Sequence, residues 1–404
     1  MNEPKLRFPE FKDIWNNHKI EDMFDRVGTP VDLDDTLTYR EIGIRSHGKG
    51  IFHKDETTAS EIGNKRIFWV EPDCFVVNIV FAWERAVAKT TEAENGMIAS
   101  HRFPMYKPKK YIVDLDYITE YFITKRGQNV LILASPGGAG RNKTLGQKEF
   151  AKSVVKLPSL PEQQKIAEFL STIDTVIEKQ KKNVSAWEER KKGVMQKLFS
   201  QEVRFKADDG SDFPEWEEKK LGDCCSLITK GTTPKEYPEN GDVNFVRIDC
   251  IENGSINISK CLKINEQIHN GELARSVLKE NDLLCSIAGA LGVVTVVTKD
   301  VLPANTNQAL AILRLYESEN VQYISKTLSS YIMEKYIREC KTVGAQPNLS
   351  LGQMRDLIIP YPCSEEQQKI ADCLSSLDEV IEKQKATLSA WEELKKGLLQ
   401  QMFV

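Results

Sequence analysis

Apolar residues recur at alternating four- and three-residue steps in two long stretches, residues 162–199 and 366–403. This spacing is the 3.5-residue period of a coiled-coil seam, so each stretch is predicted to form one helix, roughly 57 Å long, with a narrow apolar stripe. A stripe this narrow cannot bury itself, and the simplest solution is for the two helices to bury each other. The predicted seam residues are Ile166, Leu170, Ile173, Ile177, Val184, Trp187, Val194 and Leu198, followed by Ile370, Leu374, Leu377, Ile381, Leu388, Trp391, Leu398 and Met402.

The two stretches are copies of one another, identical at 25 of 38 positions. Shorter repeats flank them: Phe-Pro-Glu at 8–10 and 213–215, and Leu-Gly-Gln at 145–147 and 351–353. The chain is therefore predicted to be built twice on one plan. The expected parts are a globular domain at 1–156, a helix at 157–200, a linker at 201–212, a second globular domain at 213–358 and a second helix at 359–404.

Two seam positions are polar in both copies, Gln180 with Gln384 and Lys191 with Lys395. They could set the register and orientation of the helices, as polar seam residues often do. They could also lie at frayed or solvent-accessible points. Trp187 and Trp391 occupy seam positions and are assigned to packing rather than to base stacking.

Between the shared edges, the two globular segments differ. Stretches rich in β-branched and aromatic residues predict strands at 66–79, 129–134, 243–251 and 292–298, and an amphipathic helix is predicted at 321–340. The expected fold class is mixed α/β (α+β), with two globular domains separated by two antiparallel coiled-coil helices. If the two halves are equivalent, Met1 lies near Val404 and the arrangement is ring-like with a pseudo-two-fold axis.

Composition excludes several classes of protein. The formal net charge is −4, which does not favour nucleic-acid binding overall, although residues 121–148 carry five basic residues and no acidic one. No apolar run approaches the length of a membrane span, and the first residues lack a signal-peptide core. A cytoplasmic location is therefore expected. The nine cysteines contain no CxxC pair, so reduced packing thiols are expected.

The sequence contains none of the common catalytic motifs. The sequence has no P-loop, no GxGxxG after a strand, no HExxH and no GxSxG, and its five histidines lack metal-ligand spacing. The Gly-rich stretch at 135–140 lacks a Lys-Ser/Thr end and is read as a turn. Neither a catalytic, a metal-binding nor a cofactor-binding site is therefore expected in this chain.

The repeated Glu-Gln-Gln-Lys-Ile-Ala helices resemble the two conserved spacers of specificity subunits of type I DNA restriction–modification systems. The second domain resembles their target-recognition domains through blocks at 231–235, 281–286, 304–308 and 344–350. The first domain resembles another variety through 39–49 and 100–103. It has no GTTPK block, so the two domains should read different DNA.

This resemblance implies a non-catalytic, DNA-binding subunit that defends against foreign DNA. Such a subunit joins two methyltransferase subunits, which carry S-adenosylmethionine, and scaffolds two restriction subunits driven by ATP and Mg. Each recognition domain reads one part of a split, asymmetric target in double-stranded DNA, and the helices set the gap. The partners methylate adenine or cut the DNA.

Arg, Lys, Asn and Gln side chains read base edges, and Arg, Lys and Thr bind phosphates. On this basis, DNA contacts are expected from residues of both domains. In the first domain they are Arg45, His47, Lys49, His101 and Arg102, with Arg141 and Lys143 as phosphate contacts. In the second they are Lys230, Thr232, Thr233, Lys235, Arg247, Asn305, Asn307 and Gln308.

Two other functions fit parts of the sequence. A tandem adaptor that binds proteins along a helical rod is mildly favoured by the excess of acidic residues in 207–358. A self-sufficient methyltransferase would need a cofactor motif that the sequence lacks. Salt-dependent binding to duplex DNA in the presence of methyltransferase partners separates the first alternative from DNA recognition. Labelled S-adenosylmethionine, supplied with DNA, tests the second.

Overall fold

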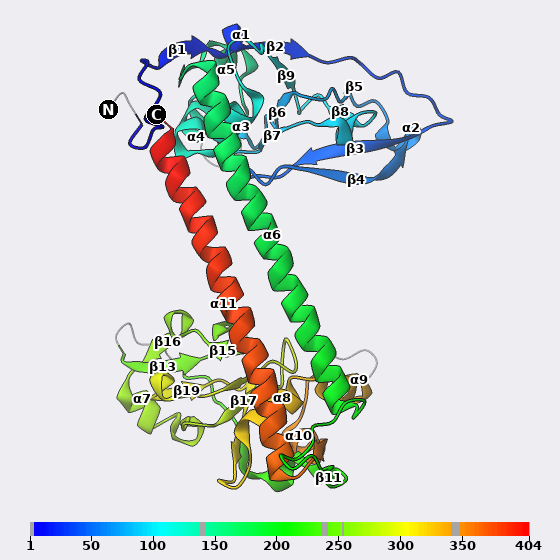
Figure 1. Cartoon of the computed structure of the whole chain (residues 1–404), viewed down its shortest axis with the longest axis vertical. Helices are drawn as coiled ribbons and strands as arrows, with labels where there is room; N and C mark the ends of the chain where they lie inside the picture. The colour runs from blue at the N-terminus through cyan, green and yellow to red at the C-terminus, as the bar shows by residue number, and fades with distance from the viewer. Residues whose placement is uncertain (1–3, 138–142, 236–240, 253, 341–347, 404) are drawn as a thin grey trace. The chain divides into compact units, whose positions relative to one another are not determined.

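A computed structural model of the chain describes residues 4–137, 143–235, 241–252, 254–340 and 348–403 (Figure 1). It contains two compact units, Met1–Lys182 with Ala386–Val404, and Asn183–Lys385. The long helices α6 (Leu160–Phe199) and α11 (Ser364–Met402) each contribute to both units. The two predicted long helices are thus present, and each is continuous.

The first unit has a frame of helices closed by one two-stranded ribbon. β1 (Asn16–Lys19) pairs antiparallel with β10 (Val154–Leu157), so the segment between them leaves and returns at one place. The other frame elements are α1 (Ile20–Met23), α3 (Leu115–Ile123), α4 (Lys125–Leu133) and α5 (Gln147–Lys152). Tyr117, Phe122 and Phe150 are fully buried in the core that joins these helices to α6 and α11.

Two four-stranded sheets project from this frame. One has the order β2-β9-β6-β7 and the other β4-β3-β8-β5. All neighbours are antiparallel except β3 and β8. The strands are β2 (Phe24–Val27), β3 (Thr38–Ile44), β4 (Ile51–Thr58), β5 (Ile67–Trp69), β6 (Phe75–Val77), β7 (Val87–Lys89), β8 (Ile98–Ser100) and β9 (Met105–Pro108), with the short helix α2 (Ala59–Ile62) after β4.

The predicted strand at 66–79 contains β5 and β6, with a turn between them, but the predicted strand at 129–134 is wrong. Those residues belong mostly to α4, whose first turn is capped by Thr124: its hydroxyl accepts the Gly127 N–H at 3.1 Å. A Cβ at Gly127 would lie 2.2 Å from the carbonyl oxygen of Tyr121, so α4 packs directly against the end of α3. Tertiary packing therefore overrides the β propensity of Val130 and Ile132.

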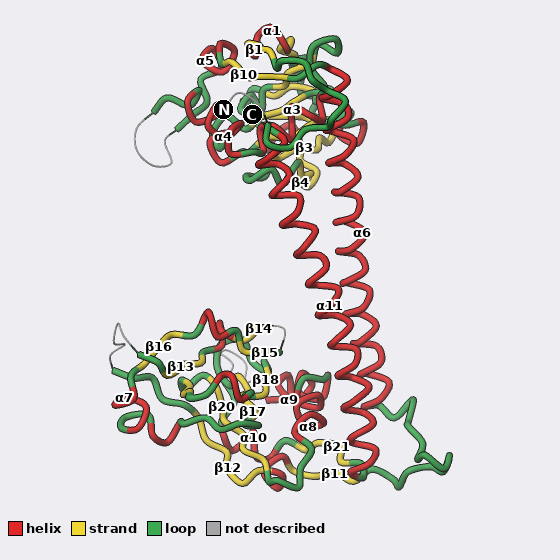
Figure 2. The backbone as a smooth tube through the Cα atoms, turned by 60° about the vertical axis from the view of Figure 1, so that its left-hand side comes forward, coloured by secondary structure: helices red, strands yellow, loops and turns green. Residues whose placement is uncertain are grey.

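The second unit repeats the ribbon and also the strand order of the first unit's sheet β2-β9-β6-β7. β11 (Glu217–Lys220) pairs antiparallel with β21 (Ile358–Tyr361). A four-stranded sheet has the order β12-β20-β17-β18, a three-stranded sheet has the order β16-β13-β19, and β14 and β15 form a hairpin (Figure 2). These strands are β12 (Cys225–Lys230), β13 (Val243–Val246), β14 (Ile251–Glu252), β15 (Ser255–Ile256), β16 (Leu262–Ile264), β17 (Leu283–Ser286), β18 (Val294–Val296), β19 (Ala304–Thr306) and β20 (Leu310–Leu315).

The helices of the second unit are α7 (Glu266–Asn270), α8 (Val321–Leu328), α9 (Tyr331–Cys340) and α10 (Leu351–Asp356). The single helix predicted at 321–340 is therefore two helices. The Ser330 hydroxyl accepts the Ile332 N–H at 3.2 Å, which is the bond of a helix N-cap. Serine competes with the backbone for hydrogen bonds, and here it ends one helix and starts the next.

In the first unit, the apolar stripe of α6 is buried on two partners. Its residues Ile166, Leu170, Ile173 and Ile177 are each at most 5% exposed. They share one core with Leu398 and Met402 of α11, and also with Tyr117 and Tyr121 of α3. The helix α3 thus completes a burial that the seam pattern assigned to the two long helices alone.

In the second unit, the remaining stripe packs in the same way. Leu198 of α6 shares a core with Ile370 and Leu374 of α11 and with Tyr323 of α8. Of the other predicted seam residues, Val184 and Ile381 are buried, whereas the half-buried ones are Trp187, Val194, Leu377, Leu388 and Trp391.

Polar contacts show that α6 and α11 run antiparallel within each unit. In the first unit, Asp174 of α6 pairs with Lys395 at 2.8 Å and Lys181 pairs with Glu392 at 3.7 Å. Along α6 the residue numbers rise while those of the α11 partners fall.

In the second unit, the pairs are Asn183 with Gln384, Glu188 with Lys385 and Lys191 with Asp378. Lys191, Lys395 and Gln384, three of the polar seam residues, therefore bind the opposite helix and are not frayed.

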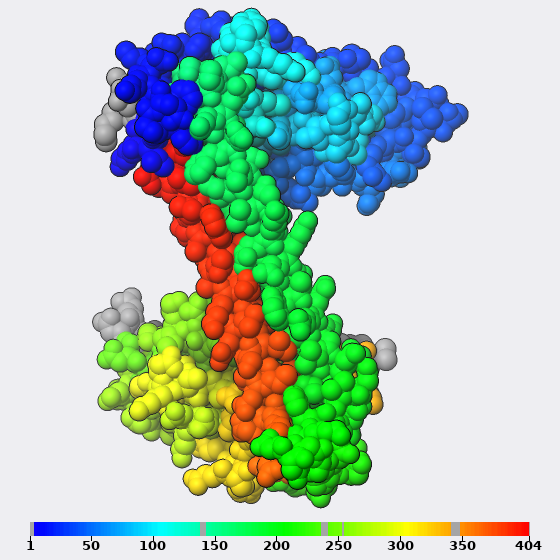
Figure 3. Space-filling model, viewed as in Figure 1, coloured from blue at the N-terminus to red at the C-terminus, as the bar shows by residue number. Residues whose placement is uncertain are grey.

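The N-terminal segment lies against both long helices in the first unit, as the dark blue residues of Figure 3 show. The Leu6 N–H donates to the Gln401 carbonyl oxygen at 3.0 Å. Phe8 contacts Phe169 edge to face, with 5.7 Å between ring centroids. The predicted contact of Met1 with Val404 falls outside the described residues.

Each long helix carries a buried glutamate in its first turn, held by an arginine. The Arg7 guanidinium donates to both carboxylate oxygens of Glu162, at 2.7 and 2.8 Å. Arg204 does the same for Glu366, at 3.1 and 2.8 Å. Both glutamates are fully buried, so the arginines neutralise charges that water cannot reach.

Candidate nucleic-acid interface

In the second unit, the ends of several strands bring the predicted DNA contacts together. β13 and β19 are parallel, with Val246 opposite Thr306, so the residues after each strand lie at the same edge. Arg247 follows β13, and Asn307 and Gln308 follow β19. The loop after β12 joins this edge, because the Thr232 N–H donates to the Thr306 carbonyl oxygen at 3.0 Å.

A close backbone approach explains the glycine in this loop. A Cβ at Gly231 would lie 2.0 Å from the Thr306 carbonyl oxygen, so a larger residue would displace the loop from the strand. The Thr233 hydroxyl then donates to the side-chain oxygen of Gln308. Lys230, Thr233, Lys235 and Gln308 are exposed, whereas Thr232 and Asn307 are half-buried.

Arg275 is part of this edge, although no sequence motif singled it out. Its Nε donates to the Thr232 hydroxyl at 3.0 Å, and its side chain is exposed. Arg275 can be identified only from its place in the fold, because this residue belongs to a short helical turn 43 residues away from Thr232 in sequence.

Asn305 points into the domain, unlike its predicted neighbours. It is fully buried, its amide donates to the Leu273 carbonyl oxygen at 2.9 Å, and its carbonyl oxygen contacts the His269 ring. These bonds hold β19 in place, so a direct base contact from Asn305 would require them to open. Arg247 is half-buried and paired with Asp249 at 2.6 Å.

In the first unit, a second strand edge gathers the predicted contacts. β3 and β8 are parallel, with Glu41 opposite Ile98, so Arg45 after β3 lies at the same edge as His101 and Arg102 after β8. The Arg45 guanidinium lies over the Phe52 ring, 4.7 Å from its centroid. All three side chains are exposed.

The turn after β3 presents His47 and Lys49 to solvent. His47 has a positive φ of 64°, and its N–H donates to the Glu84 carbonyl oxygen at 2.7 Å. The Gly48 N–H donates to the Arg85 carbonyl oxygen at 2.9 Å, which fixes the turn. Lys143 is half-buried, and Arg141 lies outside the described residues.

Chemistry of other kinds has little support in the described residues. Within them, no group of three or more His, Cys, Asp or Glu side chains could hold a metal ion. All nine cysteines are free thiols, and burial raises the pKa of Cys74 to about 11 and of Cys224 to about 12. Cys74 and Cys224 therefore stay neutral and pack in the core. No described helix has the length and apolar character needed to cross a membrane.

Each unit also has a cleft between the two long helices and a pair of short ones, and the two clefts are made of repeated residues. In the first unit, the cleft of about 790 Å³ is lined by Asp174, Ile177, Lys181, Glu392, Lys395 and Lys396. In the second unit, the counterparts in the repeat line a cleft of about 420 Å³: Asp378, Ile381, Lys385, Glu188, Lys191 and Lys192. The junction of α3 and α4 closes the first cleft, and that of α8 and α9 closes the second.

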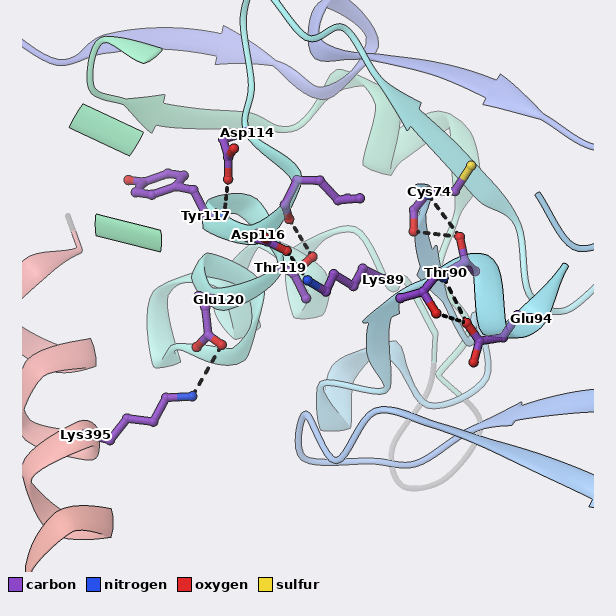
Figure 4. Close-up of polar contacts among 12 residues, drawn as sticks. Cys74, Lys89, Thr90, Glu94, Asp114, Asp116, Tyr117, Thr119, Glu120 and Lys395 are labelled. Atoms are coloured by element: carbon purple, nitrogen blue, oxygen red, sulfur yellow. Dashed lines mark hydrogen bonds and ion pairs between the residues drawn. The ribbon is translucent and has the colours of Figure 1, made fainter. Parts of the chain in front are cut away.

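At each cleft, three charged residues form a cluster in which one residue makes ion pairs with the other two. In the first unit, Lys395 contacts Asp174 at 2.8 Å. It also contacts Glu120 of α3 at 3.3 Å (Figure 4). In the second unit, Asp378 contacts both Lys191 and Lys326 of α8, each at 2.5 Å. Each cluster therefore joins the two long helices to a helix of the globular part.

Residues 73–184 and 214–390 match the family described as "Type I restriction modification DNA specificity domain". A similar protein is the type I restriction enzyme MjaVIII specificity subunit of Methanocaldococcus jannaschii, 26% identical over 352 residues, which are 84% of this chain and 80% of that protein. Another is the EcoBI specificity subunit of Escherichia coli, 25% identical over 256 residues, or 56% of this chain and 52% of that one.

Two solved structures share the fold. The S subunit of a type I restriction-modification system from M. genitalium aligns with a TM-score of 0.57 at 16% identity, covering 100% of this chain and 99% of that one. A chain from a study of complex assembly and conformational transition of the type I R-M system aligns with a TM-score of 0.59, also at 16% identity. It covers 98% of this chain and 99% of that chain.

Proposed function

Because the chain belongs to the type I restriction modification DNA specificity family, we propose that it selects the DNA target for the partner subunits of such a system. In this proposal the chain is not itself catalytic. Each of its two recognition domains reads one part of a split, asymmetric sequence in double-stranded DNA. Methyltransferase subunits carry S-adenosylmethionine and methylate adenine, and restriction subunits use ATP and Mg.

The observation that carries this proposal is a repeated frame holding two different heads. The ribbon, the buried glutamate with its arginine, and the three-residue ion cluster occur once in each unit. The sheets repeat in topology but not in detail: among the described residues, β2-β9-β6-β7 and β12-β20-β17-β18 have the same order and directions, whereas β4-β3-β8 carries an added strand, β5, that β16-β13-β19 lacks. A repeated support, with two globular parts that share a topology but carry different residues at their strand edges, suits two readers of unlike half-sites.

The two strand edges are the proposed DNA-reading surfaces. Arg45, His101 and Arg102 are exposed at one, and Lys230, Lys235 and Gln308 at the other. Their side chains offer the donors and acceptors that base edges and phosphates require. An overall charge of −4 does not oppose this, since exposed charges are screened beyond about 8–10 Å.

The repeated clefts support two copies of one partner. Equivalent side chains on α6 and α11 line both clefts, so a partner segment that fits one should fit the other. We assign them to two methyltransferase subunits, with two restriction subunits binding the resulting complex. The proposal retains the antiparallel coiled coil and the ring-like, two-fold arrangement expected from the repeat, with the helices setting the gap between half-sites.

Mapping methylated adenines in cells that carry the chain with its methyltransferase partner tests this function. We expect a split, asymmetric motif that disappears when the chain is deleted. Exchanging residues 1–156 for those of a relative should change one half of the motif only. Methylation that ignores sequence, or a change in both halves, would contradict two independent reading domains.

The spacing role has its own test. Four residues inserted between Gln180 and Val184 should alter the tolerated gap, or abolish binding, without changing the bases of either half-site. The helix gains about 6 Å and turns by about 40° beyond a full turn. A changed base preference would refute a spacing role for the helices.

A further inference from the structure

A small basic cleft lies where the two sheets of the first unit meet. The turn between β8 and β9 carries the chain from one sheet to the other, and its His101 N–H donates to the Arg66 carbonyl oxygen at 2.9 Å. On the opposite wall, Val27 of β2 pairs with Met105 of β9. The cleft between these walls has a volume of about 230 Å³.

The lining of this cleft is basic and aromatic. Arg26, Arg66 and His101 contribute three cationic or cation-forming groups, Phe68 and Phe103 contribute rings, and none of the nine lining residues is acidic. Arg26, Arg66 and His101 are exposed. Among the described residues, neither guanidinium forms an ion pair with a carboxylate, in contrast to the half-buried Arg7.

The Arg66 guanidinium is held by an aromatic face. It lies 5.9 Å from the centroid of the Phe68 ring, which restrains the side chain without using any of its N–H donors. Those donors remain available to an anion, and the planar guanidinium matches the oxygens of a phosphate in two-point contact.

The geometry points to a binding site for one backbone phosphate of duplex DNA, held by Arg26 and Arg66 beside His101. This inference rests on the proposed function, because it assigns the cleft to the DNA that the first domain reads. Arg26 and Arg66 lie outside the motif blocks of the sequence, and only the folded sheets bring them to His101. A phosphate contact here would position the domain on the duplex without reading sequence.

The test is the salt dependence of duplex binding by the chain in complex with its methyltransferase partner. Losing one phosphate contact should lower the slope of log affinity against log salt by about 0.9. We expect this drop in R26Q/R66Q, of equal size for target and non-target duplexes. The matched control R40Q removes an exposed arginine of the same unit that pairs with Glu56, and its slope should be unchanged.

The variant R26K/R66K keeps both charges and should retain most of the slope, which separates loss of the contact from misfolding. An R26Q/R66Q slope equal to that of the unsubstituted complex would overturn the inference. So would a loss confined to the target duplex, since that pattern marks base reading. If the unsubstituted complex shows no salt-dependent duplex binding, the proposed function itself fails and the cleft assignment falls with it.

Discussion

The ion cluster at the helix crossing has opposite composition in the two units. In the first, one lysine, Lys395, serves two carboxylates, Asp174 and Glu120. In the second, one carboxylate, Asp378, serves two lysines, Lys191 and Lys326. The pair contributed by the long helices is the same in both, and only the third member, from the globular part, changes sign. The same Asp–Lys pair between α6 and α11 therefore marks the register of these helices in both units.

This difference gives the two clusters opposite responses to pH. Burial raises the pKa of Glu120, and Lys395 only partly opposes it. Burial also disfavours the charged form of Asp378, but hydrogen bonds from Lys191 and Lys326 outweigh it and lower the pKa of that carboxyl. Glu120 thus costs stability as pH rises through its raised pKa, whereas the contribution of Asp378 is lost as pH falls below 3.8 towards its lowered pKa.

The buried glutamates of the two units also differ in their hydrogen-bond donors. Glu366 accepts a further hydrogen bond from the Trp216 indole at 2.8 Å. The Trp15 indole N–H in the first unit is buried and has no hydrogen-bond partner among the described residues. Glu162 consequently depends more heavily on Arg7 than Glu366 depends on Arg204.

The largest effect is expected for R7A. Removing the arginine leaves the buried Glu162 carboxylate without its bidentate partner, which costs about 3–5 kcal/mol when such a pair is broken. Hydrogen exchange of the α6 amides in the first unit measures the loss for that unit alone. R204A should cost less, because Trp216 remains on Glu366. Equal losses in both variants would show that the indole contributes nothing.

D378N should have the next largest effect. It leaves Lys191 and Lys326 without their shared anion, at a cost of about 1.5–3 kcal/mol, the range for hydrogen bonds to charged groups. Hydrogen exchange of α8 and of α11 within the second unit reports it. The control D174N should cost less, since Lys395 keeps Glu120. A larger loss in D174N would reverse the ranking of the two clusters.

W216F should cost about 1.5–3 kcal/mol more than W15F. The first removes a hydrogen bond to a buried carboxylate, and the second removes an N–H that has no described partner. Both lose similar ring volume, so each serves as the control for the other. Denaturant unfolding followed by exchange in each unit provides the comparison, and a costlier W15F would reveal a partner for that indole.

E120Q is expected to have the smallest effect, within about 1 kcal/mol at pH 7. Glutamine resembles the protonated acid, so the decline in stability of the first unit as pH rises above 4.5 should disappear in the variant. Exchange rates corrected for the intrinsic pH dependence measure this. A steeper decline in E120Q would mean that the charged form of Glu120 stabilises the unit.

Much of the frame could be predicted because periodicity is a local property. The seam pattern identified α6 and α11, and Ile166, Leu170 and Ile370 are buried as expected. The role of α3 in covering the stripe was not visible, because it depends on which surface Tyr117 and Tyr121 meet in the folded unit. The sequence predicts a strand where helix α4 forms for the same reason, because the apolar run does not reveal the contact at Gly127.

The candidate interface was predictable only where motif blocks marked it. Thr233 and Gln308 come from blocks far apart in sequence, and a hydrogen bond joins their side chains at one edge. Arg275 and Arg66 stand outside any block. A hydrogen bond from a short helical turn joins Arg275 to its edge, and the pairing of β5 with β8 brings Arg66 beside His101. Asn305 shows the reverse limit: its motif block could be recognised, but not that its side chain lies inside the domain.

The two ribbons have a consequence for how such chains change over generations. In each unit, the polypeptide enters and leaves the head through neighbouring strands, with Lys19 opposite Val154 and Lys220 opposite Ile358. Directly paired residues are about 5 Å apart, so the ribbon already holds the two ends of the globular part together. The ribbon therefore offsets the entropic cost of bringing these ends together. A different globular domain whose own termini lie close together could replace the original one without disturbing α6 and α11. Recombination could in this way give the chain a new target sequence.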